Sequence, residues 1–136
     1  MKTKALFMNL TAFSIICIML PQISKAASPG WENPQGLDYS MCIYAKVFDQ
    51  QGSEMAVAPE SAISAWTSEG TLAGCTSEPV DSPAGTIFTF QVFHELSMAE
   101  NLTVKVYDSE LDEVFETEYI FDFAAGTTLG DVVNPV

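Results

Sequence analysis

Four carboxylates lie within one short stretch of the chain, at Asp108, Glu110, Asp112 and Glu113. Hard cations such as Ca²⁺ bind clustered carboxylate oxygens, which makes this stretch a candidate calcium site. It lacks the glycine and the distal glutamate of an EF-hand loop. A solvated turn explains the same residues in so acidic a chain, so we expect weak calcium binding at most and no other cofactor.

Aromatic side chains form the second group with binding potential, and the candidates are Trp31, Trp66, Tyr44 and Tyr107. Exposed rings on a sheet can stack on sugars, which would make the protein a carbohydrate-binding module. The competing interpretation is that the rings cover the ends of a small core or pair across strands. Glycan binding therefore requires that these rings be exposed and coplanar.

Catalytic chemistry has little to build on in this sequence. His94 is the only histidine, and no serine near it stands in a recognisable nucleophile motif. A blue-copper site needs two histidines, so His94, Met98 and Cys75 do not complete one. We therefore expect no enzymatic activity and no catalytic residue.

The first 26 residues have the organisation of a secretory signal peptide. Met1-Lys-Thr-Lys4 is basic, the stretch from Ala5 to Leu20 is largely apolar, and Ser24-Lys25-Ala26 offers small residues for a cleavage site. Polar interruptions and a proline make the apolar stretch short for a membrane span. We expect cleavage after Ala26, a secreted or periplasmic protein that is not inserted in a membrane, and a single domain at residues 27–136.

Cleavage would remove Cys17 and leave Cys42 and Cys75. An even pair of cysteines in an oxidising compartment predicts a disulfide. The bond would close a loop of about thirty residues and stabilise the fold by roughly 3 kcal/mol in the chain-entropy model.

The charge of the chain restricts its partners. The formal net charge is −13, and removal of three lysines with the signal leaves two lysines against 18 acidic residues, which is −16. Nucleic acids, anionic lipids and phosphorylated substrates need cationic groups on the protein, so we exclude them as partners. The acidity fits solubility outside the cell, or attraction to a cationic partner.

Alternation of apolar and polar residues predicts the strands that position these side chains. The pattern covers 41–48, 86–93, 102–108 and 114–123, with shorter strands at 61–66 and 71–75 around a turn at 67–70. Residues 76–85 and 96–100 are expected to be connections. Short strands without a convincing helix predict an all-β, antiparallel β-sandwich of about seven strands and of immunoglobulin or fibronectin-like size.

Read from end to end, residues 27–136 resemble a poorly characterised β-sandwich module that recurs in secreted and cell-surface proteins of environmental Gram-negative bacteria. The matching pieces are Trp31 with Asn33-Pro34, Tyr39-Ser40-Met41, Ile63-Ser64-Ala65-Trp66, Glu69 with Gly74, Phe88 to Phe93, Glu100 to Asp108, and Phe121 to Gly130. Members of that family usually carry an arginine next to the glycine, where this chain has Ala73 and Cys75. The resemblance implies the fold and the location, and it implies no activity.

These observations predict a secreted, non-catalytic interaction or structural module. We expect it to bind a protein or the surface matrix through its loops and sheet edges. The alternatives are a carbohydrate-binding module that uses its exposed aromatic rings, and a weak calcium-binding extracellular protein.

Overall fold

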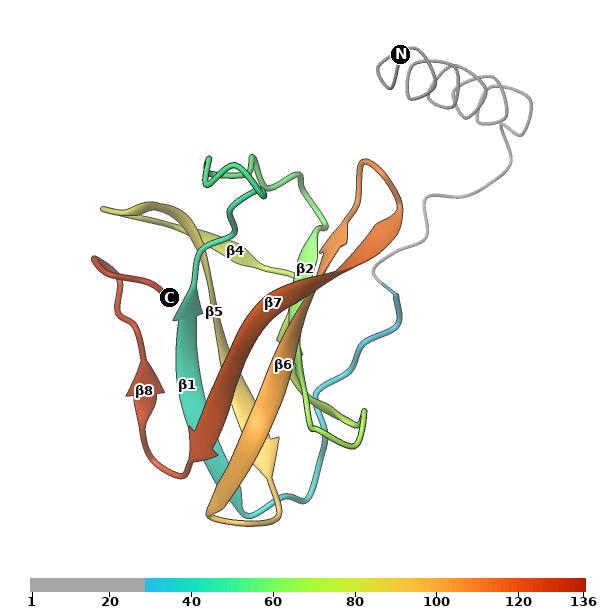
Figure 1. Cartoon of the computed structure of the whole chain (residues 1–136), viewed down its shortest axis with the longest axis vertical. Coiled ribbons are helices and arrows are strands. Elements are labelled where there is room, and N and C mark those ends of the chain that lie inside the picture. Colours follow the sequence, from blue (N-terminus) through green and yellow to red (C-terminus); the bar gives the residue numbers. More distant parts are fainter. Residues whose placement is uncertain (1–28) are drawn as a thin grey trace, which may run out of the picture.

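The computed structural model describes residues 29–136, so the predicted signal peptide lies outside the described residues. The described part is all-β, and two four-stranded sheets pack as a sandwich (Figure 1). The strands are β1 (Tyr39–Ala45), β2 (Ala62–Trp66), β3 (Leu72–Thr76), β4 (Pro79–Ser82), β5 (Gly85–His94), β6 (Met98–Asp108), β7 (Glu113–Ala124) and β8 (Thr128–Leu129). Across residues 29–136, no helix is long and apolar enough to cross a membrane.

One sheet has the order β4-β5-β1-β8 and the other the order β3-β2-β6-β7. The expected alternation places every second residue of the long strands in the space between the sheets. The resulting core contains Met41, Ile43, Ala45, Ile63, Ala65, Ala73, Phe88, Phe90, Val92, Leu102, Val104, Val106, Phe121 and Phe123. Burial of each large side chain stabilises the fold by about 1.5–3 kcal/mol.

Three details of the predicted sandwich are wrong. The segment expected to be a connection at 76–85 contains β4, which begins at a proline and forms an antiparallel hairpin with β5. Strand β6 begins at Met98, inside the other expected connection. The sandwich is also not purely antiparallel, because β8 pairs with β1 in parallel. Proline at the first residue of an edge strand removes no ladder hydrogen bond, which explains how β4 tolerates Pro79.

Gly74 closes one side of the sandwich. A Cβ atom built on Gly74 would lie 2.1 Å from the carbonyl oxygen of Gln91 and 3.0 Å from the Cα of Val92. Strand β3 of one sheet therefore rests directly on the backbone of β5 in the other, which only glycine permits.

The free edge of β1 is covered by later parts of the chain. Strand β8 pairs with Cys42 and Ile43. Further along, the amide of Val136 donates to the carbonyl of Tyr44, and the amide of Lys46 donates to the carbonyl of Val136, both at 2.8 Å. Asp131 fixes this tail by accepting hydrogen bonds from the amides of residues 133 and 134, which lower the pKa of its carboxyl group. Both edges of the β1 sheet are thus short or covered.

Candidate functional site

Strand β7 forms an edge of its sheet that no described segment covers. It is 12 residues long and pairs only with β6 within the described residues. Its carboxyl-terminal part is anchored in the core by Phe121 and Phe123, whereas most of the preceding part is exposed. In Figure 1, β7 crosses in front of β6, and the β6–β7 turn projects at the upper right. A long, uncovered edge strand offers unpaired backbone groups to another chain.

The exposed part of β7 is unusually apolar for an edge. Exposed fractions are 44% for Val114, 40% for Phe115, 40% for Tyr119 and 59% for Ile120. Phe115 lies opposite the buried Val106, so it belongs to the inner face of the sheet. Val114 and Ile120 lie opposite Tyr107 and Thr103 and so belong to the outer face. Both faces of this segment therefore present apolar side chains to solvent.

A bulge interrupts the exposed part of β7. The register passes from Lys105–Glu116 to Thr103–Ile120, so residues 117–119 lie opposite Val104 alone. The hydroxyl of Thr117 donates to the carbonyl of Val104 at 2.9 Å and replaces the interrupted ladder. Bulges of this kind re-aim side chains and end strand pairing. Thr117 and Tyr119, which belong to this bulge, line a pocket between the sheets.

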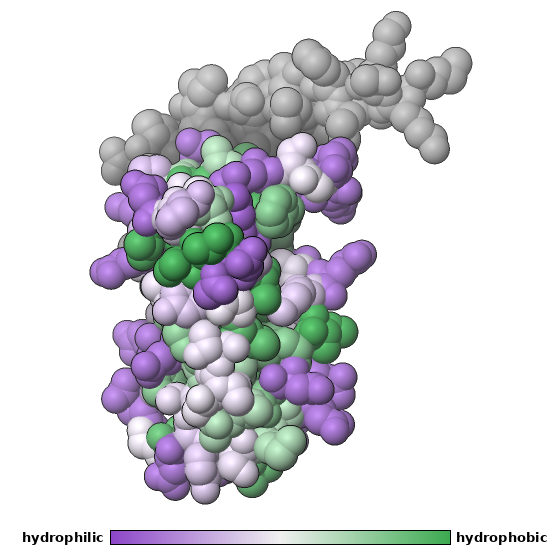
Figure 2. Space-filling model, turned by 90° about the vertical axis from the view of Figure 1, so that its left-hand side faces the viewer, coloured by the Kyte–Doolittle hydropathy of each residue, from purple (hydrophilic) through white to green (hydrophobic). Residues whose placement is uncertain are grey.

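This inter-sheet pocket has a volume of about 240 Å³. Its floor consists of core residues of both sheets, including Ile43, Ile63, Phe90 and Val104, and its rim includes Phe48, Thr117, Tyr119 and Val136. It lies on the open side of the sandwich, between the tail that covers β1 and the bulge of β7. Seen from the left-hand side of Figure 1, hydrophobic surface emerges between hydrophilic groups in the upper half of the molecule (Figure 2). The pocket is thus an opening into the core.

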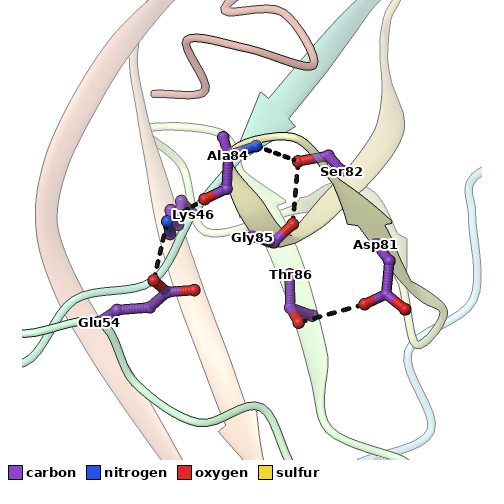
Figure 3. Close-up of polar contacts among 7 residues, drawn as sticks. All are labelled: Lys46, Glu54, Asp81, Ser82, Ala84, Gly85 and Thr86. Atoms are coloured by element: carbon purple, nitrogen blue, oxygen red, sulfur yellow. Dashed lines mark hydrogen bonds and ion pairs between the residues drawn. The ribbon is translucent and has the colours of Figure 1, made fainter.

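Lys46 lies at the pocket, and its ammonium group is already engaged (Figure 3). It forms an ion pair with Glu54 at 2.9 Å and donates to the carbonyl oxygen of Ala84. Gly85 has φ of 104°, and a Cβ on it would lie 2.7 Å from Oε1 of Glu54. The close packing of this turn holds Lys46 away from any ligand anion, so the pocket offers no free cation.

The candidate calcium residues do not converge. No group of three or more carboxylate, histidine or cysteine side chains among residues 29–136 is placed to hold a metal ion. Asp108 instead accepts hydrogen bonds from the amides of Glu110 and Leu111, and Asp112 accepts one from the hydroxyl of Tyr107 at 2.8 Å. Local hydrogen bonds thus occupy Asp108 and Asp112, and Glu110 and Glu113 point to solvent as exposed residues.

The four candidate glycan-binding rings do not form one platform. Trp31 and Trp66 are half-buried and meet edge to face, with an interplanar angle of 75°. The indole of Trp66 donates to Ser64, and the ammonium group of Lys105 lies 4.8 Å from its ring centroid. Tyr107 is only 3% exposed, and Tyr44 is half-buried on the other sheet. The rings of this set therefore pack against the protein itself.

The predicted disulfide is wrong, because Cys42 and Cys75 are free thiols. Cys42 lies on β1 between two inward residues, so its side chain points out of one sheet, where its sulfur is 3.9 Å from the hydroxyl of Thr89. Cys75 lies opposite Ser64, on the outer face of the other sheet. A disulfide needs Cβ atoms about 4 Å apart, and side chains on opposite outer faces of a sandwich cannot meet.

Cys75 and His94, the residues considered above for a copper site, are not among the residues that line the inter-sheet pocket. Burial and the nearby charge of Glu32 raise the pKa of the Cys75 thiol, which disfavours the reactive thiolate. A polar groove of about 320 Å³ passes Cys75 and Trp31. His94 ends β5 as expected, and its Nδ1 accepts the amide hydrogen of Leu96 at 2.9 Å while its ring lies 5.5 Å from that of Phe123. These contacts give His94 a structural role at the end of the strand.

Comparisons with models of protein families, with characterised proteins and with solved structures find no match to this chain. The resemblance to a surface module therefore stays a prediction. Sequence reasoning identified the alternation of apolar and acidic residues in β7. It did not identify the free edge or the pocket, because both depend on the order of the strands.

Proposed function

We propose that this protein is an exported, non-catalytic interaction module that binds an extended segment of another protein along the free edge of β7. The observation that carries the proposal is the exposed stretch from Glu113 to Ile120, which combines an unpaired edge with apolar side chains beside a pocket. An extended segment would gain main-chain hydrogen bonds along the edge, and its side chains would find the pocket. Export is supported by the basic and apolar organisation of the first 26 residues.

A short extended peptide tests the proposal directly. The probe is an octapeptide of alternating valine and serine, N-methylated at every second residue so that it has a single hydrogen-bonding edge and cannot assemble with itself. We expect its addition to ¹⁵N-labelled protein to shift and protect the amides of residues 113–120 in NMR spectra. Absence of any change at these amides, at millimolar peptide, would overturn the proposal.

Two matched substitutions locate the binding. Ile120 on β7 and Leu96 in the β5–β6 connection have almost equal exposed fractions, 59% and 57%. We expect Ile120→Ser to weaken peptide binding several-fold because it removes apolar contact from the edge, whereas Leu96→Ser leaves it unchanged. Equal effects of the two substitutions would show that the peptide binds apolar surface without regard to the edge.

A further inference from the structure

We infer that the partner of the β7 edge is an extended segment in which basic and apolar side chains alternate, an inference that rests on the proposed function. The first observation is the charge of the edge. Four carboxylates stand on β7, at Glu113, Glu116, Glu118 and Asp122, and all four residues are exposed. Among residues 29–136 only two ion pairs form, and only one of them, between Lys105 and Glu116 at 3.0 Å, reaches β7.

The second observation is the division of β7 into two faces. Glu116 lies opposite Lys105 on the outer face, beside Val114 and Ile120. Phe115 lies on the inner face, and Tyr119 lines the pocket. Side chains of a strand added to this edge alternate between the two faces. Those on the outer face would stand about 5 Å from the row that contains Glu116, and those on the inner face would stand at the pocket. The outer face, where Glu116 stands between Val114 and Ile120, therefore favours basic side chains, whose apolar stems can lie along the two aliphatic residues. The inner face favours apolar side chains.

The pocket matches an amino-acid side chain better than a separate small molecule. Its volume of about 240 Å³ is below the range of roughly 300–1,000 Å³ that is typical of small-molecule sites. Its rim and floor are mostly aliphatic and aromatic, and the ammonium group of Lys46 is engaged by Glu54. One leucine, isoleucine or phenylalanine side chain of the partner is a suitable occupant.

A second copy of this chain does not meet these requirements. Strand β7 carries no basic residue, and the two basic side chains of the described part, Lys46 and Lys105, both form ion pairs. Two β7 strands placed edge to edge would set carboxylates against carboxylates, and like charges in cross-strand positions destabilise the pairing. The acidic residues thus oppose self-association and attract a basic segment.

Three peptides with a common apolar face test the inference. Each is an octapeptide with leucine at alternate positions and lysine, serine or glutamate at the others, again N-methylated on one edge. We expect the lysine peptide to bind about tenfold more tightly than the serine peptide at low ionic strength, and the glutamate peptide to bind most weakly. The preference for lysine should shrink between 20 mM and 500 mM salt because the charges are exposed.

A pair of double variants separates the charge of the edge from the charge of the whole protein. Glu113→Lys with Glu118→Lys changes β7 but keeps the pair between Lys105 and Glu116. Glu69→Lys with Glu95→Lys makes the same change of net charge in the β2–β3 turn and the β5–β6 connection. We expect the first double variant to lose or reverse the order of the three peptides and the second to keep it. Circular dichroism and thermal melts of both variants confirm that the fold is intact.

Each result has a distinct meaning. Equal binding of the three peptides at residues 113–120 overturns this inference and leaves the proposed function in place. An equal loss of lysine preference in both double variants also overturns it, because only the net charge then matters. Concentration-dependent dimerisation that is abolished by Ile120→Ser would assign the edge to a second copy instead. If no peptide binds, the proposed function fails, and this inference fails with it.

Discussion

Replacement of Gly74 by alanine tests the contact that closes one side of the sandwich. The added Cβ would lie 2.1 Å from the carbonyl oxygen of Gln91, where ordinary van der Waals contact begins at 3.4 Å, so the two strands must separate by about 1.3 Å. Both partners are backbone atoms and no side chain can rotate away. Such overpacking lowers the free energy of unfolding by about 3 kcal/mol, the upper end of the usual range. A loss of that size lowers Tm by roughly 12–24 °C in a domain of about 100 residues.

The cost is measured by urea unfolding followed by circular dichroism, with Gly126→Ala as the control. Gly126 has φ of 73° and open space around it, so alanine there meets only the strain of a left-handed backbone, about 1–2 kcal/mol. Gly74 has no such strain, because its φ is not positive. If Gly74→Ala costs less than the control, β3 does not rest on β5, and our explanation of the close approach of the two sheets at Gly74 is refuted.

The remaining predictions concern single side chains. Burial, followed by the hydrogen bond and charge of Asp112, raises the pKa of Tyr107. The contribution of the neutral Tyr107 side chain to the free energy of unfolding is therefore complete below pH 10, and it is lost as the pH rises through the folded-state pKa. Tyr107→Phe should therefore lower stability at pH 7 by about 1–2 kcal/mol and flatten the alkaline part of the curve of unfolding free energy against pH. Thermal melts in 5 mM CaCl₂ and in EDTA should coincide, because Asp108 and Asp112 accept local hydrogen bonds, and a rise of Tm in calcium would contradict this. Alkylation after unfolding without reductant should label both Cys42 and Cys75, and native alkylation should be slow at Cys75, whose pKa is raised.

The alternation of apolar and polar residues predicted the strands that have one face buried in the core. It did not predict the strands that lack this alternation. The alternation in 86–93 places Phe88, Phe90 and Val92 on one face, and all three are buried. The alternation in 102–108 places Lys105 on the face opposite Leu102 and Val104, and Lys105 forms its ion pair with Glu116 there. Strand β8 has only two residues, too few to show an alternation of apolar and polar residues. It is defined by its backbone pairing with β1. Strand β4 was missed because it begins with Pro79 and is followed by Pro83, although an edge strand tolerates proline at its first residue.

The candidate sites show the limit of reasoning from residue types. Cys42 stands between the inward residues Met41 and Ile43, so the pattern itself places its thiol on an outer face. The prediction of a disulfide rested on the number of cysteines and did not consider this direction. The two thiols lie on the outer faces of different sheets. The indole of Trp66 has its donor satisfied within the domain, by Ser64, which no sequence pattern reports. The free edge of β7 follows from strand order, which depends on contacts between residues distant in the chain.

The covering of β1 by the segment that ends at Val136 has a consequence for how the protein matures. Strand β1 is the first strand to emerge during synthesis or translocation, yet its neighbours β5 and β8 arrive much later, and its last hydrogen bonds come from residue 136. Such distant pairing makes folding slow. If the chain is exported as we propose, this late completion of the β1 edge would keep it unfolded until its last residues have emerged. Removing the final residues should delay or prevent folding without altering a single residue of the β7 edge.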